Sequence, residues 1–179
     1  AKGFAQIVKY FGRLIIFDRE TDATVLSPRN FASHENETGR VMNFRMPVAQ
    51  DGPAITALIA ACPPLDGNSA YCNLLQCTHF ADSCIVAERD GQIVGWVSGY
   101  RLPADPGRFF IWQVAVAAEA RGEKLAQRMI AALLDRPSAI GVTHLITTVT
   151  PDNAASWALF DGIARRLGAE LTKAPLFER

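Results

Sequence analysis

Hydrophobic and polar positions divide the chain into a polar leader and a denser region that begins near residue 41. Residues 18–40 are polar, contain several turn-forming residues and show no sustained period, which is typical of a mobile segment. The apolar stretch before them, residues 7–17, is compatible with a strand or a helix that docks elsewhere. We therefore expect a mobile N-terminal extension over residues 1–40 and one folded domain over residues 41–179.

The first part of the domain predicts a helix and then a hairpin. A short helix is expected at residues 53–62, because a proline suits its first turn, and residues 62–71 carry the prolines and small polar residues of a loop. β-Branched and aromatic residues on both sides of Asp90-Gly91 predict two strands joined by a tight turn. A further turn is expected over residues 103–108.

A third strand over residues 109–116 is apolar on both faces if its side chains alternate regularly. A strand that is covered on both faces lies in the middle of its sheet. Gln113 is its one polar residue, and a buried amide normally has hydrogen-bonding partners. Regular alternation divides the apolar side chains into two sets, with Phe110, Trp112, Val114 and Val116 on one face and Phe109, Ile111 and Ala115 on the other.

A helix, a strand and a second helix complete the pattern. Apolar residues recur at helical spacing from Leu125 to Leu133, and residues 143–151 predict a fourth strand. Asn153 and Gly168 suit the N-cap and the end of the last helix. The order of the elements indicates an α+β fold in which an antiparallel meander feeds a β-α-β crossover.

The charge balance and the cysteine content exclude several classes of function. The 18 basic and 18 acidic residues cancel, so no basic excess is available to bind nucleic acid or acidic lipid. No apolar run reaches the length of about 18 residues that a membrane span needs, and no signal peptide is expected. The four cysteines form no CxxC pair and stand beside no histidine cluster, so we expect reduced thiols in a cytoplasmic protein and no metal site. They are Cys62, Cys72, Cys77 and Cys84.

The junction between the third strand and the next helix contains Arg121-Gly122. The start of a helix offers free backbone N–H groups and the positive end of the helix dipole, which together bind anions. Gly122 allows close approach of a ligand to the backbone, Arg121 adds a charge, and Ala126 keeps the first turn thin. The alternative is an ordinary helix start with a solvated Arg and Lys.

The stretch "VAVAAEARGEKLA" resembles the acetyl-CoA motif of the GNAT family of N-acetyltransferases, V-x-V-x-x-x-x-R-G-x-G-x-A/G, with Lys124 where the family usually has glycine. The resemblance implies the GNAT fold, a mixed and mostly antiparallel sheet with helices on both faces. It also implies that the central strand splays from its neighbour and that the pantetheine arm of acetyl-CoA lies in the gap. The residues that it implies for coenzyme binding are Val114, Val116, Arg121, Gly122, Lys124, Leu125, Ala126, Asn153, Ser156 and Phe160.

Phe160 is a second departure from the family. Many members carry a tyrosine at this position, seven residues after the Asn, where it protonates the leaving thiolate. The proton must therefore come from another group, and Ser156, Tyr71 and an ordered water are the candidates. After the last helix the family has two further strands, whereas the sequence has room for one. The other strand is absent, supplied by a partner subunit or replaced by the leader.

Three longer stretches, residues 62–88, 99–116 and 147–160, closely resemble the family of L-2,4-diaminobutyrate acetyltransferases, which acetylate a side-chain amine on the way to ectoine. This resemblance covers about residues 44–172. It implies transfer of an acetyl group from acetyl-CoA to the 4-amino group of L-2,4-diaminobutyrate by a homodimer. An acetyltransferase for another amine and a non-catalytic CoA-binding module remain as alternatives.

A site for diaminobutyrate needs a carboxylate for an ammonium group and hydroxyl or amide donors for the acid. The candidates for substrate binding are Asp66, Asn68, Ser69, Tyr71, Trp112, Gln113, Thr148 and Thr150. We expect Asp66 to accept the proton of the amine, and the backbone N–H around Val114 to polarise the thioester carbonyl, in a direct transfer without an acyl-enzyme. Tyr71 completes the predicted catalytic set. Structural alternatives are a turn or helix cap for Asp66, a tie to a neighbouring loop for Gln113, simple packing for Trp112 and Tyr71, and strand propensity alone for the threonines.

Overall fold

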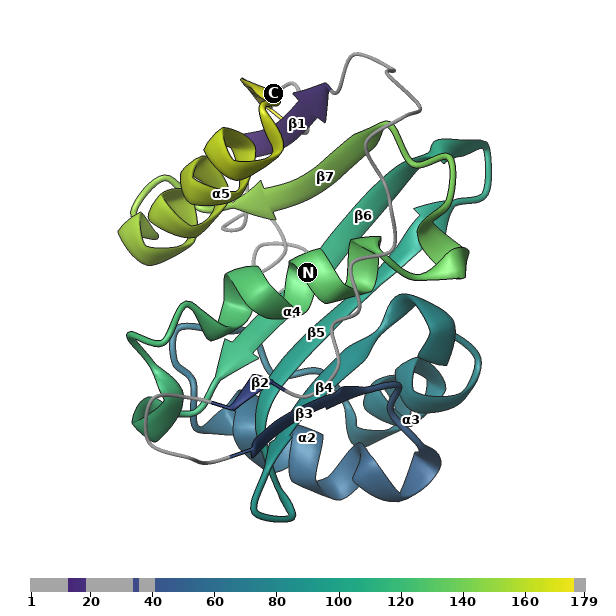
Figure 1. The fold of residues 1–179 in the computed structure, drawn as a ribbon, viewed down its shortest axis with the longest axis vertical. Helices are drawn as coiled ribbons and strands as arrows, with labels where there is room; N and C mark the ends of the chain where they lie inside the picture. Colours follow the sequence, from purple (N-terminus) through teal and green to yellow (C-terminus); the bar gives the residue numbers. More distant parts are fainter. Residues whose placement is uncertain (1–12, 19–33, 36–40, 176–179) are drawn as a thin grey trace, which may run out of the picture.

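The computed structural model describes residues 13–18, 34–35 and 41–175 (Figure 1). Most of the predicted mobile extension lies outside the described residues, so its mobility stays a prediction, as does the domain boundary at residue 41. Two strands of the leader are described, β1 (Arg13–Asp18) and β2 (His34–Glu35). None of the helices in the described residues is both long and apolar enough to span a membrane.

The described strands form one mixed sheet in the order β2-β3-β4-β5-β6-β7-β1-β8. All neighbours are antiparallel except β6 and β7, which are parallel and are connected through a helix. The α+β plan with a central β-α-β crossover is therefore confirmed. The bounds of the remaining strands are β3 Val41–Arg45, β4 Ile85–Arg89, β5 Gln92–Leu102, β6 Asp105–Val116, β7 His144–Val149 and β8 Glu170–Pro175.

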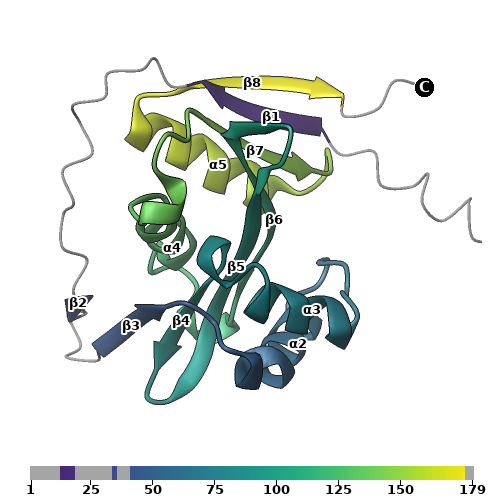
Figure 2. The same cartoon turned by 90° about the vertical axis from the view of Figure 1, so that its right-hand side faces the viewer.

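Helices cover both faces of the sheet, as Figure 2 shows. On one face lie α2 (Gly52–Ala60) and α3 (Ala70–Thr78), which bury a core around Ile55 and Trp96. On the other face lie α4 (Leu125–Leu134) and α5 (Ala154–Leu167), which bury a larger core around Met129 and Phe160. The apolar positions that predicted α4 are those that it buries, because Leu125, Met129 and Leu133 point to the sheet.

Local signals in the sequence specify the ends of several elements. Asn153 accepts a hydrogen bond from the N–H of Ser156 at the start of α5, and Gly168 ends that helix with φ +62°. The hairpin turn between β4 and β5 has φ +53° at Asp90 and +75° at Gly91, which is the left-handed backbone that an Asp-Gly turn favours. These predicted ends are confirmed.

Strand β6 begins at Asp105, four residues earlier than expected. Leu102 pairs with Asp105, so only two residues form the turn and the predicted turn over residues 103–108 is too long. Likewise α3 begins at Ala70, inside the predicted loop, because the Ser69 hydroxyl caps it. Strand β3 was not predicted from the pattern, whereas β8 is the one strand for which the sequence has room after the last helix.

The leader contributes a strand to the middle of one half of the sheet. Strand β1 pairs antiparallel with β7 on one side and with β8 on the other. Of the two conformations that were compatible with residues 7–17, the described part adopts a strand. It occupies the position beside β7, so the single strand that follows α5 does not contact β7 in the described sheet.

The ladder between β5 and β6 contains a β-bulge at Trp112. Ser98 lies opposite Gln113 and Gly99 lies opposite Ile111, so Trp112 is an extra residue in β6 without a partner in this ladder. Each extra residue shifts the alternation of side chains by one position. Odd-numbered residues before the bulge and even-numbered residues after it consequently face the same side of the sheet.

The regular alternation expected for residues 109–116 is therefore wrong beyond the bulge. Phe109 and Ile111 belong to the core beneath α4 and α5, and Val114 packs against that same core, whereas Ala115 belongs to the core beneath α2 and α3. Trp112 is 47% exposed, so the strand is not covered on both faces along its whole length. Its central position in the sheet is confirmed.

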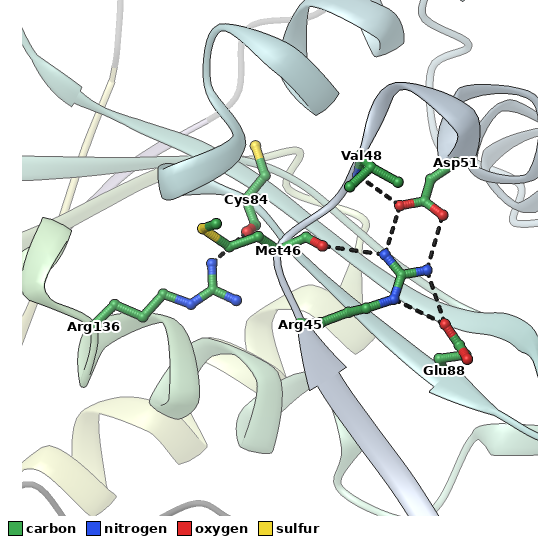
Figure 3. Close-up of polar contacts among 7 residues, drawn as sticks. All are labelled: Arg45, Met46, Val48, Asp51, Cys84, Glu88 and Arg136. Carbon is green, nitrogen blue, oxygen red and sulfur yellow. Dashed lines mark hydrogen bonds and ion pairs between the residues drawn. The ribbon is translucent and has the colours of Figure 1, made fainter.

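A partly buried network of charges joins β3, β4 and the residue before α2 (Figure 3). Arg45 donates two hydrogen bonds to the Asp51 carboxylate, at 2.7 and 2.9 Å, and one to Glu88 at 2.9 Å. The Asp51 carboxylate also accepts from the N–H of Val48 at 2.7 Å. The Arg45 guanidinium is the main reason why the pKa of Asp51 is lowered from its usual value. This network, which the sequence pattern did not indicate, fixes the start of α2 against the sheet.

Candidate active site

A cavity of about 600 Å³ lies where β6 and β7 separate. The two strands pair over only four residues each, and in the described ladder this pairing ends at Ile111 and Thr147. Beyond these residues the strands diverge, which is the splay that the family resemblance implies. The cavity is lined by Pro64, Leu65, Asp66, Asn68, Ile111, Trp112, Gln113, Val114, Thr147, Thr148, Val149, Thr150, Pro151, Asp152, Asn153, Ser156 and Phe160.

A groove of about 380 Å³ continues from this cavity to the start of α4. The two spaces share Pro64, Leu65, Val114, Asn153 and Ser156, so they form one continuous channel. At its far end the groove is bordered by the predicted coenzyme residues Val116, Arg121, Gly122, Lys124, Leu125 and Ala126. Every predicted coenzyme residue therefore lines the groove, the cavity or both.

The corner before α4 has an unusual backbone. Gly122 has φ +85° and Lys124 has φ +53°, so two of its residues adopt the left-handed conformation. Glycine reaches this region without the clash that Cβ causes. Lys124 stands where the GNAT motif usually has glycine, and the observed φ supplies a physical reason for the family's preference.

Replacing Lys124 by glycine is expected to stabilise the fold. Removing Cβ from a left-handed residue relieves about 1 kcal/mol, which corresponds to a rise in Tm of about 2–4 °C for a chain of this size. Thermal unfolding followed by circular dichroism measures the shift. Lys124→Ala is the matched control, because it removes the charge but keeps Cβ and the strain. A Tm for Lys124→Gly at or below that of the control would contradict the expectation.

Backbone donors of β6 face the gap between β6 and β7. The N–H of Ala117 donates to Val94 of β5 at 2.9 Å, and N–H groups alternate in direction along an antiparallel strand. Those of Val114 and Val116 therefore point away from β5. In agreement, the Val116 carbonyl accepts hydrogen bonds from Cys62 Sγ at 3.3 Å and from Arg121 Nε at 3.2 Å. The geometry is compatible with the role that the sequence predicts for the Val114 N–H.

Gln113 ties the loop between α2 and α3 to β6. Its side chain is 7% exposed, its Nε2 donates to the Asp66 carbonyl at 2.8 Å, and its Oε1 accepts from Asn68 Nδ2 at 2.9 Å. This is the structural alternative that the sequence left open for Gln113. The tie holds the exposed Asp66 side chain and Asn68 at the cavity. Gln113 also lines the cavity, so its predicted contact with the substrate stays a prediction.

Ser69 and Tyr71 lie apart from the other candidates. The Ser69 hydroxyl accepts from the N–H of Cys72 at 3.1 Å as the cap of α3, and the Tyr71 side chain is 70% exposed. Neither residue is among those lining the cavity or the groove in the described structure. The packing alternative for Tyr71 also finds no support in its exposure. Their predicted roles in substrate binding and catalysis stay predictions.

The opposite wall is formed by the end of β7 and the start of α5. Thr148 and Thr150 line the cavity, and the Thr150 carbonyl is held by Trp157 Nε1 at 3.0 Å. Phe160 is 3% exposed, lines the cavity and has no proton to give. Of the two side chains considered as alternative acids, Ser156 borders both spaces of the channel, whereas Tyr71 borders neither in the described structure.

The two parts of the channel differ in charge. Among the described residues, the cavity is lined by the carboxylates of Asp66 and Asp152 and by no cationic side chain. The groove is lined by Arg121 and Lys124 and, within the same described ranges, by no carboxylate. Asp152 was not among the residues predicted from the sequence, although its place in the turn "TPDN" before the α5 cap is a signal that could have indicated it. This polarity favours a cationic ligand in the cavity and an anionic ligand in the groove.

Most of the described cysteines and histidines lie away from the channel. Burial raises the pKa of Cys77 to about 11 and that of Cys84 to about 12, and neither thiol lines the channel. Cys62 borders only the groove. His79 and His144 also lie outside the lining of both spaces, and the part of the chain that the structure describes contains no group of three potential metal ligands.

Known proteins resemble this chain in sequence and structure. Residues 53–163 match the acetyltransferase (GNAT) family. The L-2,4-diaminobutyric acid acetyltransferase of Methylotuvimicrobium alcaliphilum is 45% identical over 139 residues, which are 78% of this chain and 81% of the relative. That of Halomonas elongata is 50% identical over 135 residues, covering 75% of this chain and 70% of the relative.

A solved structure gives a comparable match. Diaminobutyrate acetyltransferase from Paenibacillus lautus, in complex with L-2,4-diaminobutyric acid and coenzyme A, is 33% identical with a TM-score of 0.72. The match covers 79% of this chain and 99% of that chain. The chain therefore belongs to the GNAT family of acetyltransferases and, within it, to the L-2,4-diaminobutyric acid acetyltransferases.

Proposed function

We propose that the protein transfers the acetyl group of acetyl-CoA to the 4-amino group of L-2,4-diaminobutyrate, which gives N4-acetyl-L-2,4-diaminobutyrate and CoA in ectoine biosynthesis. The observation that carries the proposal is the charge polarity of the channel. A groove bordered by two cations and a helix start suits the CoA diphosphate, and a cavity bordered by two carboxylates suits a diamino acid. The relatives' names and the bound ligands of the Paenibacillus lautus enzyme agree with this assignment.

The residues of the corner fit the coenzyme. A Cβ built at Gly122 would meet nothing within 4 Å, so the space over this residue is open. Arg121, Lys124 and backbone N–H groups at the start of α4 would hold the diphosphate. Acetyl-CoA supplies an activated acetyl group as a thioester. No metal is part of the proposal.

The cavity residues fit the amino acid. Its two ammonium groups would lie near Asp66 and Asp152, and the hydroxyls of Thr148 and Thr150 would bind its carboxylate. The exposed Trp112 forms part of the wall. The homodimer implied by the family resemblance stays a prediction.

The reaction requires an uncharged amine, because an alkylammonium with a pKa of about 10 has no free electron pair. Asp66 accepts the proton, and the amine nitrogen then forms a bond to the carbonyl carbon while the carbon–sulfur bond breaks. The Val114 N–H stabilises the negative charge that develops on the carbonyl oxygen. The nitrogen then releases its second proton, which Ser156 or a water passes to the leaving sulfur, since Phe160 cannot.

A panel of amines tests the function. The purified protein is incubated with acetyl-CoA and, separately, L-2,4-diaminobutyrate, ornithine, lysine, putrescine or 2-aminobutyrate, and thiol release is followed. We expect diaminobutyrate to have the highest kcat/KM, with ornithine, one methylene longer, about 10 to 200 times lower. NMR of the product is expected to locate the acetyl group on N4.

Two outcomes would favour the alternatives. A higher kcat/KM for a different amine would make the protein an acetyltransferase with another substrate. Calorimetric binding of CoA without thiol release from acetyl-CoA on addition of any amine would make it a non-catalytic binding module. Acetylation at N2 would contradict the predicted orientation of the substrate.

A further inference from the structure

Two consecutive charged residues at the end of β4 form ion pairs with different parts of the fold. Glu88 binds Arg45, which holds the start of α2, with an N–O distance of 2.8 Å. Arg89 binds Glu123 in the corner before α4, with 3.0 Å between Nη1 and Oε1. Successive side chains of a strand point to opposite faces, so one pair lies on each side of the sheet.

The Arg89–Glu123 pair connects β4 to the corner before α4, residues 121–124, through a side chain that does not line the groove. Glu123 lies between the two left-handed residues, Gly122 and Lys124. Within residues 121–127 it is the one residue that does not line the groove, so its side chain leaves the corner in another direction. The Arg89 side chain is only 11% exposed and that of Glu123 is 31% exposed. Because its arginine is largely buried, this ion pair is less screened by salt than a pair between two exposed side chains.

We propose that Arg89 is a positioning residue for acetyl-CoA, which it does not itself contact. Its pairing with Glu123 holds the corner in the conformation that presents the N–H groups around Gly122 to the diphosphate. Without the pair, the corner samples other conformations, and coenzyme binding must supply the cost of ordering it. This inference rests on the proposed binding of acetyl-CoA at the corner.

Two neutral variants and their combination test the inference. In Arg89→Gln and in Glu123→Gln, we expect the Kd of CoA and the KM of acetyl-CoA to rise about tenfold, while kcat and the KM of diaminobutyrate stay unchanged. Because both residues act through one pair, the double variant is expected to lose no more affinity than either single variant. Calorimetry measures CoA binding independently of turnover.

Glu88→Gln is the matched control, because it removes a neighbouring ion pair on the other side of the sheet (Figure 3). It is expected to lower Tm and to leave the Kd of CoA unchanged. If Arg89→Gln and Glu123→Gln behave like this control, the Arg89–Glu123 pair is merely structural and the inference is overturned. Losses that multiply in the double variant overturn it as well.

The proposed function and this inference can fail separately. A wild-type protein that binds no CoA contradicts the proposed function. A wild-type protein that binds CoA, together with variants that bind it equally well, contradicts only the role of Arg89. If Arg89→Gln does not fold, Glu123→Gln decides, because it removes one charge from a side chain that is one-third exposed.

Discussion

The Asp66→Asn variant is expected to acetylate diaminobutyrate about 100 to 10,000 times more slowly than the wild type, the range that loss of a general base produces. Asparagine has the same shape but neither accepts the proton of the amine nor pairs with its charge. The fold is expected to persist, because the bond from Gln113 goes to the Asp66 backbone carbonyl and not to its side chain. Steady-state kinetics with saturating acetyl-CoA measure the effect.

The pH dependence of this variant is diagnostic. The rate is expected to rise toward pH 10, since the fraction of uncharged amine grows as the pH approaches a pKa of about 10. Asp90→Asn is the matched control, because it makes the same chemical change in the hairpin turn, away from the channel. If Asp66→Asn keeps the wild-type rate at neutral pH, another group accepts the proton. Asp152, the other carboxylate that lines the cavity, would be the next to replace.

The double variant Arg121→Glu, Gly122→Glu is expected to weaken CoA binding by more than about 100-fold. It removes a charged donor, worth about 1.5–3 kcal/mol, and adds two negative charges beside a diphosphate. A side chain at φ +85° also costs about 1–2 kcal/mol of backbone strain. Titration calorimetry with CoA measures the loss directly.

Gly122→Ala separates strain from charge. A Cβ at this position would meet no atom within 4 Å, so alanine adds the backbone penalty alone. We expect it to weaken CoA binding by about tenfold or less. An unchanged Kd in the doubly acidic variant would mean that the diphosphate binds elsewhere, and the proposed function would lose its main support.

Features with a local physical cause could be predicted from the sequence. Asn153 and Gly168 cap a helix through bonds to residues of that helix, and Asp90-Gly91 turns a hairpin through its own backbone. The corner at Arg121-Gly122 was also evident, because an anion site at a helix start depends on the order of a few residues. The residues that border the groove were therefore indicated by this corner and by the family resemblance, and their contact with the coenzyme stays a prediction.

Features that depend on distant partners could not be predicted in this way. The bulge at Trp112 arises from the register with β5. Because of it, the Val114 side chain lies on the opposite face of the sheet from the one that regular alternation predicts. The partners of Gln113 lie in a loop more than forty residues away in the sequence. Asp152 resembles an ordinary turn residue until the opposite wall of the cavity is seen. The cavity is assembled by such long-range contacts.

The insertion of β1 between β7 and β8 affects the order in which the sheet can assemble (Figure 2). Strands β4, β5 and β6 are consecutive hairpins, so their pairing closes only short loops. Pairing β1 with β7 instead closes a loop that contains most of the polypeptide, with a correspondingly larger loss of chain entropy. High contact order of this kind slows folding. The meander of β4, β5 and β6 can therefore form early. Strand β7, which forms part of one wall of the channel, acquires its second neighbouring strand only after β1 has docked.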